Sequence, residues 1–166
     1  ATPITGPPPV AATPSRRLHA ANFAFLVELI QGAYDAHIII TTGPREGELA
    51  TQVAAQMSHS PIIVNQATPM QLAALLQRCN LYISNDTGPM HLSTAVKTPT
   101  IALFGASNLI QWAPPWDRHA VVARKGCEFM KTLSSKEWDT HTDRARENFE
   151  AITPDAVMAT VEKITW

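Results

Sequence analysis

The feature that most constrains the fold is a regular alternation of short apolar runs with longer segments of helical periodicity. The apolar runs, typical of buried strands, cover residues 37–43, 61–65, 81–84, 100–105 and 119–123. The segments whose apolar residues recur every three or four positions cover residues 20–31, 46–57, 68–79, 90–97 and 153–164. Strands that alternate with helices predict a mainly parallel sheet with right-handed crossovers. We therefore predict an α/β domain with a Rossmann-like parallel sheet and helices on both faces.

Residues 68–79 have the clearest helix start. Thr68 can cap the first turn, Pro69 suits the first helical position, and Gln71 stands where a capping box places Glu or Gln. By contrast, residues 124–148 are polar, mixed in charge and without a clear period. We predict a long excursion or an irregular helix there.

The N-terminal stretch differs from the rest of the chain in its high proline content. Residues 1–15 hold five of the 13 prolines, and proline lacks an amide hydrogen and fixes its own backbone angle. We predict that residues 1–15 are a proline-rich arm or linker, because their sequence is poorly suited to a strand. The folded domain is then predicted to cover residues 16–166.

Length and composition narrow the function classes. A chain of 166 residues suits one domain, and 45% hydrophobic with 16% charged residues is the profile of a globular protein. A formal net charge of −1 argues against a nucleic-acid partner. Cys79 and Cys127 have no metal-binding spacing and favour free thiols in a reducing compartment. We expect a cytoplasmic protein, with peripheral attachment at the inner membrane face as the alternative.

The stretch SNDTGPMHLSTA, residues 84–95, is the best candidate site because it joins a predicted strand to a predicted helix. The first amides of a helix lack partners and favour an anion such as phosphate, and Gly88 would let that anion approach the backbone. Thr87 and His91 can donate hydrogen bonds, whereas Asp86 suits sugar hydroxyls or holds the loop. The alternative is a simple helix start, because Asp and Thr are ordinary caps and Pro89 is ordinary in a first turn.

Other polar groups indicate no second chemistry. The acids and His within residues 139–143 favour a solvated loop over a metal site, and no His-Glu-x-x-His spacing occurs. Ser84 and Ser93 lack the context of a hydrolase nucleophile. We therefore predict no metal and no cofactor. Trp112 and Trp116 could shape a cleft or stack on a ligand, but we favour packing against the sheet edge.

Several segments, in order, resemble one enzyme family. LYISNDTGPMHLSTAVKTPTIALFG, residues 81–105, closely resembles the donor-binding half of the glycosyltransferases that include the ADP-heptose:lipopolysaccharide heptosyltransferases. Weaker similarity to the same family lies in residues 16–29, 41–50, 111–116 and 152–164. The Asp-Thr-Gly-Pro-Met-His core is the specific part of the resemblance.

The resemblance implies one half of a GT-B fold, in which two Rossmann-like domains face each other across a cleft. This chain resembles the C-terminal, donor-binding half. The partners implied are a nucleotide diphosphate sugar of the ADP-heptose kind, a saccharide or lipid-linked saccharide acceptor, and an N-terminal acceptor domain. The chain alone is expected to be inactive. The alternative is a non-catalytic nucleotide-sugar-binding or interaction module that has lost transferase activity.

The resemblance also implies roles for individual residues. Asp86, Thr87, Gly88 and Pro89 match the motif that meets the donor's phosphates and sugar, and His91 matches its histidine. None of these residues is assigned a catalytic role.

Two further segments of the resemblance carry candidate donor-binding residues. Gly43 and Glu46 match a Gly-Pro-x-Glu segment whose acid lies near the nucleotide ribose, and a carboxylate can accept both ribose hydroxyls. Arg16 falls on the family's pyrophosphate lysine, with a planar guanidinium in place of an ammonium. The alternatives are an ordinary acid at a helix start for Glu46 and a solvated charge for Arg16.

Overall fold

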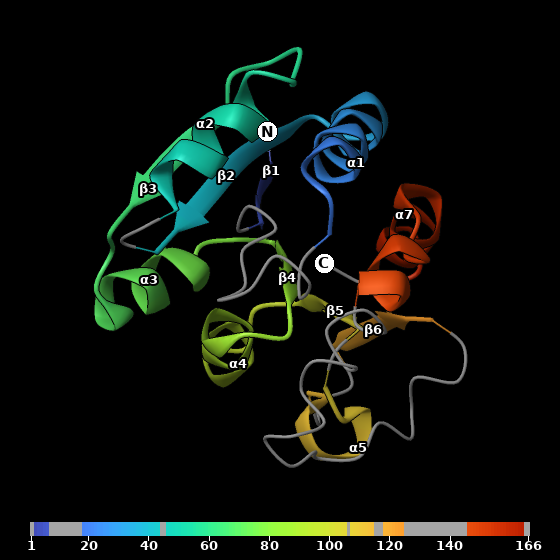
Figure 1. The fold of residues 1–166 in the computed structure, drawn as a ribbon. Coiled ribbons are helices and arrows are strands. Elements are labelled where there is room, and N and C mark those ends of the chain that lie inside the picture. The colour runs from blue at the N-terminus through green and yellow to red at the C-terminus, as the bar shows by residue number, and fades with distance from the viewer. Residues whose placement is uncertain are drawn as a thin grey trace.

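Within the residues that the structure describes, the sheet has six strands, all parallel. The computed structural model describes residues 2–6, 18–43, 46–105, 107–114, 118–124 and 146–164. The strands are β1 (Thr2–Gly6), β2 (Ala36–Thr42), β3 (Ile62–Asn65), β4 (Leu81–Asn85), β5 (Thr100–Phe104) and β6 (His119–Ala123). Their order across the sheet is β3-β2-β1-β4-β5-β6 (Figure 1). This is the Rossmann order, so the predicted fold class is confirmed.

The strand order reverses between β1 and β4. From β1 the chain builds outward through β2 to β3, and then returns to place β4 on the other side of β1. Neighbouring crossovers diverge at such a point and leave a crevice beyond the carboxyl ends of the strands, where α/β proteins bind ligands. The turn that follows β4 therefore lies at the favoured position for a site.

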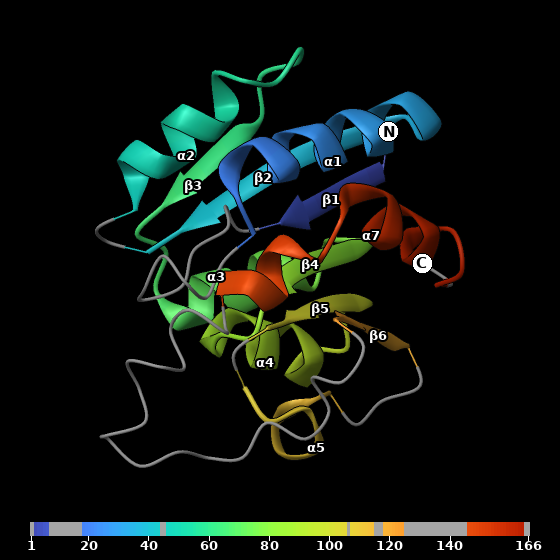
Figure 2. The same ribbon diagram turned by 45° about the vertical axis from the view of Figure 1, so that its right-hand side comes forward.

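Helices cover both faces of the sheet. They include α1 (Ala20–Ala33), α2 (Gly47–Ala54), α3 (Pro69–Leu76), α4 (Gly88–Ala95), α5 (Leu109–Trp112) and α7 (Pro154–Val161). Figure 2 shows α1, α2 and α7 on one face, with α1 packed against the other two, and α3 and α4 together on the opposite face.

The core follows the alternation of side chains along the strands. On the α1 face, Leu81 and Ile83 of β4 pack with Ile101 and Leu103 of β5 and with the apolar sides of the helices. On the α4 face, a smaller cluster joins Met90, Ala102 and Phe104. Because successive strand residues point to opposite faces, these short apolar runs supply both layers of the core.

One predicted boundary is wrong. Residues 1–15 were predicted to be an arm and a poor strand, but Thr2–Gly6 forms β1, which pairs with β2 and β4 at the centre of the sheet. Pro3 lies near the start of the strand, where a missing amide costs the ladder least, and pairing with β4 involves only Ile4 and Thr5. Residues 7–15 lie outside the described residues.

The helix starts agree well with the sequence. The Gln71 amide donates to Thr68 Oγ1 over 3.3 Å, and the Thr68 amide donates to Gln71 Oε1 over 2.9 Å, which completes the predicted capping box of α3. The α1 prediction holds as well, with its stripe from Phe23 to Ile30 buried. The predicted irregular segment 124–148 lies mostly outside the described residues.

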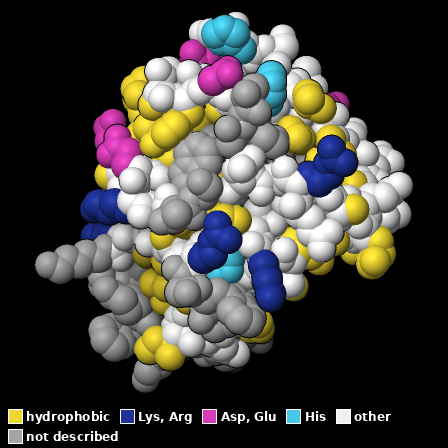
Figure 3. Space-filling model, turned by 180° about the vertical axis from the view of Figure 1, so that it is seen from behind, with side chains coloured by type: hydrophobic (Ala, Val, Ile, Leu, Met, Phe, Trp, Pro, Cys, Tyr) yellow, Lys and Arg dark blue, Asp and Glu magenta, His cyan; other side chains and the backbone are white. Residues whose placement is uncertain are grey.

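The surface carries scattered apolar groups. Seen from behind, hydrophobic side chains appear as separate small groups with basic and histidine side chains among them (Figure 3). Large exposed apolar side chains include Ile62, Met70, Ile110 and Trp112. None of the helices in the described residues is long and apolar enough to cross a membrane.

Candidate functional site

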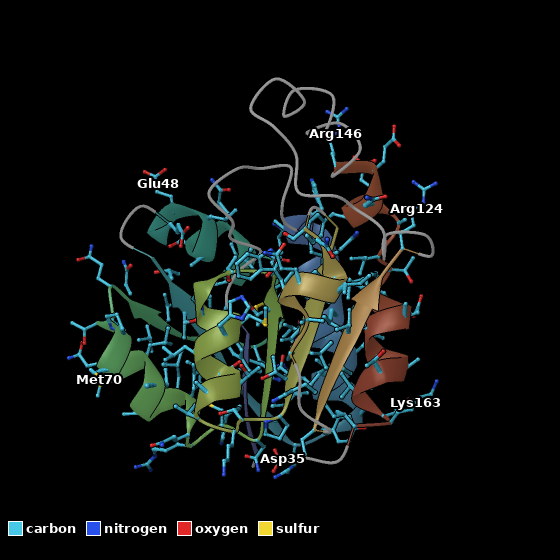
Figure 4. The ribbon with its side chains drawn as sticks, turned by 90° about the horizontal axis from the view of Figure 1, so that it is seen from below. Asp35, Glu48, Met70, Arg124, Arg146 and Lys163 are labelled. Carbon is cyan, nitrogen blue, oxygen red and sulfur yellow. The ribbon has the colours of Figure 1, made fainter. Side chains whose placement is uncertain are left out.

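The candidate residues gather at the carboxyl edge of the sheet, in the turns after β2 and β4. Gly43 and Glu46 lie between β2 and α2, while Asp86 and Thr87 lie between β4 and α4. The ends of β2 and β4 are two strand positions apart, roughly 10 Å. Figure 4 shows Glu48, Arg124 and Arg146 toward this end of the molecule and Asp35 and Lys163 toward the opposite end.

The β4–α4 turn brings an acid and a histidine together. Asp86 Oδ1 lies 3.7 Å from His91 Nε2, and the Asp86 side chain is 12% exposed whereas that of His91 is 44% exposed. The Asp86 amide donates to the Leu103 carbonyl over 3.2 Å, which fastens the turn to the end of β5. The pair therefore presents an acceptor and a potential donor at the surface of one fixed turn.

The start of α4 is open. Thr87 is the N-cap, yet its side chain accepts no hydrogen bond from the helix. Its hydroxyl instead donates weakly to the Asn85 carbonyl over 3.4 Å. Gly88 and Pro89 are the first two helical residues, and a Cβ built on Gly88 meets no heavy atom of the described residues within 4 Å. Packing in the described structure therefore does not explain why this position is glycine.

Most other described helices begin with a side-chain cap. His19, Thr68, Asn108 and Thr153 each accept a backbone amide at the start of α1, α3, α5 and α7. Among the described helices, α2 and α4 have no such bond. Those two helices follow the two predicted segments, so the missing caps coincide with the candidate site.

The β2–α2 turn is closed by its own acid. Glu46 Oε2 accepts the Gly43 amide over 2.6 Å, and the Glu46 amide donates to the Gly43 carbonyl over 3.2 Å. A Cβ on Gly43 would lie 2.7 Å from Glu46 Oε2. Thr42 of β2 donates to Asn65 Oδ1 of β3 over 2.6 Å, which ties this turn to the neighbouring strand. The Glu46 carboxylate, which is predicted to bind a ribose, thus already forms a hydrogen bond within this turn.

The residue before Asp86 was not singled out from the sequence. Asn85 ends β4 and is 2% exposed, and neither its amide nitrogen nor its amide oxygen has a hydrogen-bond partner among the described residues. Leaving a buried polar group unpaired costs about 1–3 kcal/mol. The only sequence signal was an amide that follows Ser84 at the polar end of an apolar run.

Two of the described basic side chains at this edge lie near acids. Arg124 Nη1 lies 3.9 Å from Glu147 Oε2, and Arg146 Nε lies 3.9 Å from Glu150 Oε1. Arg16, the predicted pyrophosphate contact, lies outside the described residues. Within the part of the chain that the structure describes, no three His, Cys, Asp or Glu side chains are grouped closely enough to hold a metal ion.

Trp112 occupies an unexpected place. The interpretation that Trp112 packs against the sheet edge stays a prediction, and its ring contacts His91, with ring centroids 5.9 Å apart and planes at 60°. The residue is 47% exposed. The aromatic contact adds Trp112 of α5 to the pair formed by Asp86, in the turn before α4, and His91 of α4.

Comparison with known proteins adds independent evidence. Residues 2–141 match the model of glycosyltransferase family 9 (heptosyltransferase). Lipopolysaccharide heptosyltransferase 3 of Escherichia coli is 29% identical over 150 residues, which are 87% of this chain and 42% of that protein. Lipooligosaccharide heptosyltransferase 2 of Campylobacter jejuni subsp. jejuni serotype O:2 is 32% identical over 104 residues, 60% of this chain and 32% of that protein.

Solved structures agree on the fold. The crystal structure of the glycosyl transferase family 9 protein from Veillonella parvula DSM 2008 superposes with a TM-score of 0.81 at 27% identity, covering 98% of this chain and 45% of that one. The E. coli heptosyltransferase WaaC with ADP has a TM-score of 0.74 at 16% identity, with 98% and 43% covered. The chain thus spans less than half of these relatives and has one half of a GT-B fold. Because the family match covers most of the sequence, the chain belongs to glycosyltransferase family 9.

Proposed function

We propose that this chain is the donor-binding half of a heptosyltransferase-like enzyme. The enzyme would transfer a sugar from a nucleotide diphosphate sugar to a lipopolysaccharide-type or other saccharide acceptor, with inversion. The observation that carries the proposal is the uncapped start of α4 beside the point where the strand order reverses. Family membership and the name of the relative solved with ADP support the same class of ligand.

The proposed roles follow from the chemistry of each group. The diphosphate lies at the start of α4, where the helix dipole and amides favour an anion and Gly88 keeps the approach clear. The Thr87 hydroxyl and the His91 imidazole donate to phosphate or sugar oxygens. Asp86 accepts from sugar hydroxyls, because a carboxylate offers only acceptors and would repel a phosphate.

The remaining assignments are proposals of the same kind. Glu46 has one carboxylate oxygen on the Gly43 amide, so its other oxygen would accept a ribose hydroxyl. Arg16 would contact the pyrophosphate, and Pro89 would fix the first turn of α4. Asn85 is buried next to Asp86 and its side-chain amide has no partner among the described residues, which supports a site here, because an apolar residue would suit the fold better.

In this proposal the chain alone transfers no sugar. An acceptor hydroxyl needs a base within roughly 3 Å, and the groups placed here serve the donor. The acceptor and that base would belong to the N-terminal half. Purified chain with a sugar nucleotide and a deacylated lipopolysaccharide core should release no nucleoside diphosphate. Acceptor-dependent release that Asp86→Ala abolishes would contradict this part.

Calorimetry tests donor binding directly. ADP, UDP, GDP and their sugars are titrated into the chain, and at least one nucleoside diphosphate is expected to bind one site. Lack of binding by the whole panel to folded chain would reject the proposed function. Binding that survives Asp86→Ala and Gly88→Val together would place the ligand elsewhere.

A further inference from the structure

The least expected contact of the site is made by Trp112, which lies 21 positions after His91 in the sequence and comes from a different helix. The two rings meet edge to face, at 5.9 Å between centroids and 60° between planes. Such aromatic pairs have a preferred geometry and restrict the rotation of both rings. His91 is therefore held on one side by an indole and faces Asp86 Oδ1, 3.7 Å away.

Trp112 is the last residue of the short helix α5, which is fixed in place by a cap and by an apolar contact. Asn108 Oδ1 accepts the amides of Ile110 and Gln111, over 2.9 and 3.3 Å, and so caps α5. Leu109 packs against the cluster that contains Met90, the residue next to His91. Leu109 and Trp112 are three positions apart and share one side of the helical turn. Leu109 is thus anchored on the cluster of Met90, Ala102 and Phe104, and Trp112, on the same side of α5, has its indole against His91.

Exposure separates Trp112 from its neighbour in the same helix. Ile110 is 78% exposed, whereas Trp112 is 47% exposed and has a specific ring partner. His91 is itself half-exposed, and without the indole its imidazole could turn away from Asp86 about its free side-chain bonds. In the unliganded chain the imidazole thus lies between the Trp112 indole and the Asp86 carboxylate.

We propose that Trp112 is a positioning residue: its indole holds the His91 imidazole beside Asp86 in the orientation that the donor's diphosphate requires. This inference rests on the proposed function and adds to it a residue outside the Asp-Thr-Gly-Pro-Met-His core. Trp112 acts through His91 and needs no contact of its own with the donor.

A double-mutant cycle tests whether Trp112 acts through His91. ADP affinity is measured by calorimetry for the unchanged chain, Trp112→Ala, His91→Ala and the double variant. Trp112→Ala should weaken ADP binding about threefold to tenfold, the range expected from an aromatic pair. In the His91→Ala background the same change should have no further effect, because the group that Trp112 positions is already gone. Losses that multiply in the double variant would overturn the proposal and indicate direct stacking on the ligand.

Two further variants separate positioning from general damage. Trp112→Phe keeps an aromatic ring and should restore most of the affinity that Trp112→Ala loses. Ile110→Ala alters the same helix without touching His91 and should leave ADP affinity unchanged. Equal losses in Ile110→Ala and Trp112→Ala would show that α5 acts only as a structural element, and would overturn the positioning role.

A ligand-free measurement keeps this inference separate from the proposed function. The NMR signal of the His91 Cε1 proton should be displaced by the nearby indole and should move toward that of a solvated histidine in Trp112→Ala. An unmoved signal would refute the contact, whatever ADP does. If the unchanged chain binds no ADP, the proposed function falls and the part of this inference that concerns the donor falls with it.

Discussion

The two turns at the carboxyl edge look alike in sequence and differ in structure. Each joins a buried strand to a helix and contains a glycine and an acid. After β2, the Glu46 carboxylate folds back onto the Gly43 amide and occupies the space that a side chain at Gly43 would take. After β4, Asp86 faces His91, and nothing described lies within 4 Å of a Cβ on Gly88. In the described part of the first turn the Glu46 carboxylate is hydrogen-bonded within the turn, whereas the second turn pairs Asp86 with His91 and leaves the start of α4 without a side-chain cap.

The difference between the two turns shows how a glycine in a strand-to-helix turn can be interpreted. A glycine whose missing side chain is needed by its own neighbours reports on folding. Free space alone marks no site, because a Cβ on Gly32 of α1 also meets nothing described within 4 Å, whereas Gly88 combines that space with the uncapped start of α4. Gly105 resembles Gly43, since a Cβ there would lie 2.5 Å from the Phe149 ring. At Gly88 the described packing sets no requirement for glycine, so a substitution there tests the proposed anion site with little effect on the fold.

The largest effect is expected from Asp86→Ala. Losing a charged acceptor for sugar hydroxyls should weaken sugar-nucleotide binding by about tenfold to hundredfold. Binding of inorganic phosphate should weaken less or improve, because the carboxylate repels anions. Calorimetry with both ligands checks this. Equal losses for the two ligands would make Asp86 a residue that only holds the loop.

Gly43→Ala should act on stability rather than on the anion site. The new methyl group would displace the Glu46 carboxylate from the Gly43 amide, at a cost of about 1–2 kcal/mol in unfolding free energy. Gly88→Ala is the matched change in the other turn and should cost less than about 0.5 kcal/mol. Urea unfolding of both variants measures the two costs. Equal costs would remove the contrast between the turns.

Glu46→Gln sharpens the role of the acid in the closed turn. Glutamine keeps an acceptor for the Gly43 amide but loses the charge, so unfolding free energy should fall by about 0.5–1 kcal/mol. If Glu46 also meets the ribose, affinity for ADP falls as well, while affinity for pyrophosphate does not. Unchanged ADP affinity would limit Glu46 to a structural role.

The smallest effect concerns a carboxylate far from the site. Glu28 accepts the Ser58 amide over 2.6 Å, and this hydrogen bond lowers the pKa of Glu28 below its usual 4.5. Its stabilisation is present above the ordinary pKa and is lost as the pH falls through the lowered value, because the protonated acid is the weaker acceptor. Near the surface the contribution should be a few tenths of a kcal/mol. The difference in unfolding free energy between the unchanged chain and Glu28→Gln should therefore shrink as the pH is lowered from about 6 to about 3. This interval spans the ordinary pKa of a glutamate side chain. A constant difference would contradict the assignment.

Much of the fold was predictable because strand and helix signals are local. The apolar runs of β2, β4 and β5 and the capping box of α3 specify their elements within a few residues. β1 was missed because Thr2–Gly6 contains a proline and is short, and its place depends on pairing with β2 and β4, which are distant in sequence. The four-residue helix α5 was missed for lack of a periodic pattern.

The site was predictable in part. The motif after β4 marked Asp86 to His91, because helix starts and their polar residues are contiguous in sequence. The contact of Trp112 with His91, the unpaired Asn85 amide and the closure of Glu46 onto Gly43 depend on tertiary geometry. Their roles in donor binding stay predictions.

The most direct test of the central claim is the ADP affinity of Gly88→Val, measured by calorimetry beside its unfolding free energy. Free space around the Cβ position means that the variant should fold with stability close to that of the unchanged chain. The added side chain should block the approach of a diphosphate to the start of α4, so ADP affinity should fall at least about tenfold, the equivalent of roughly 1.4 kcal/mol. A stable Gly88→Val chain that binds ADP as tightly as the unchanged chain would contradict the account.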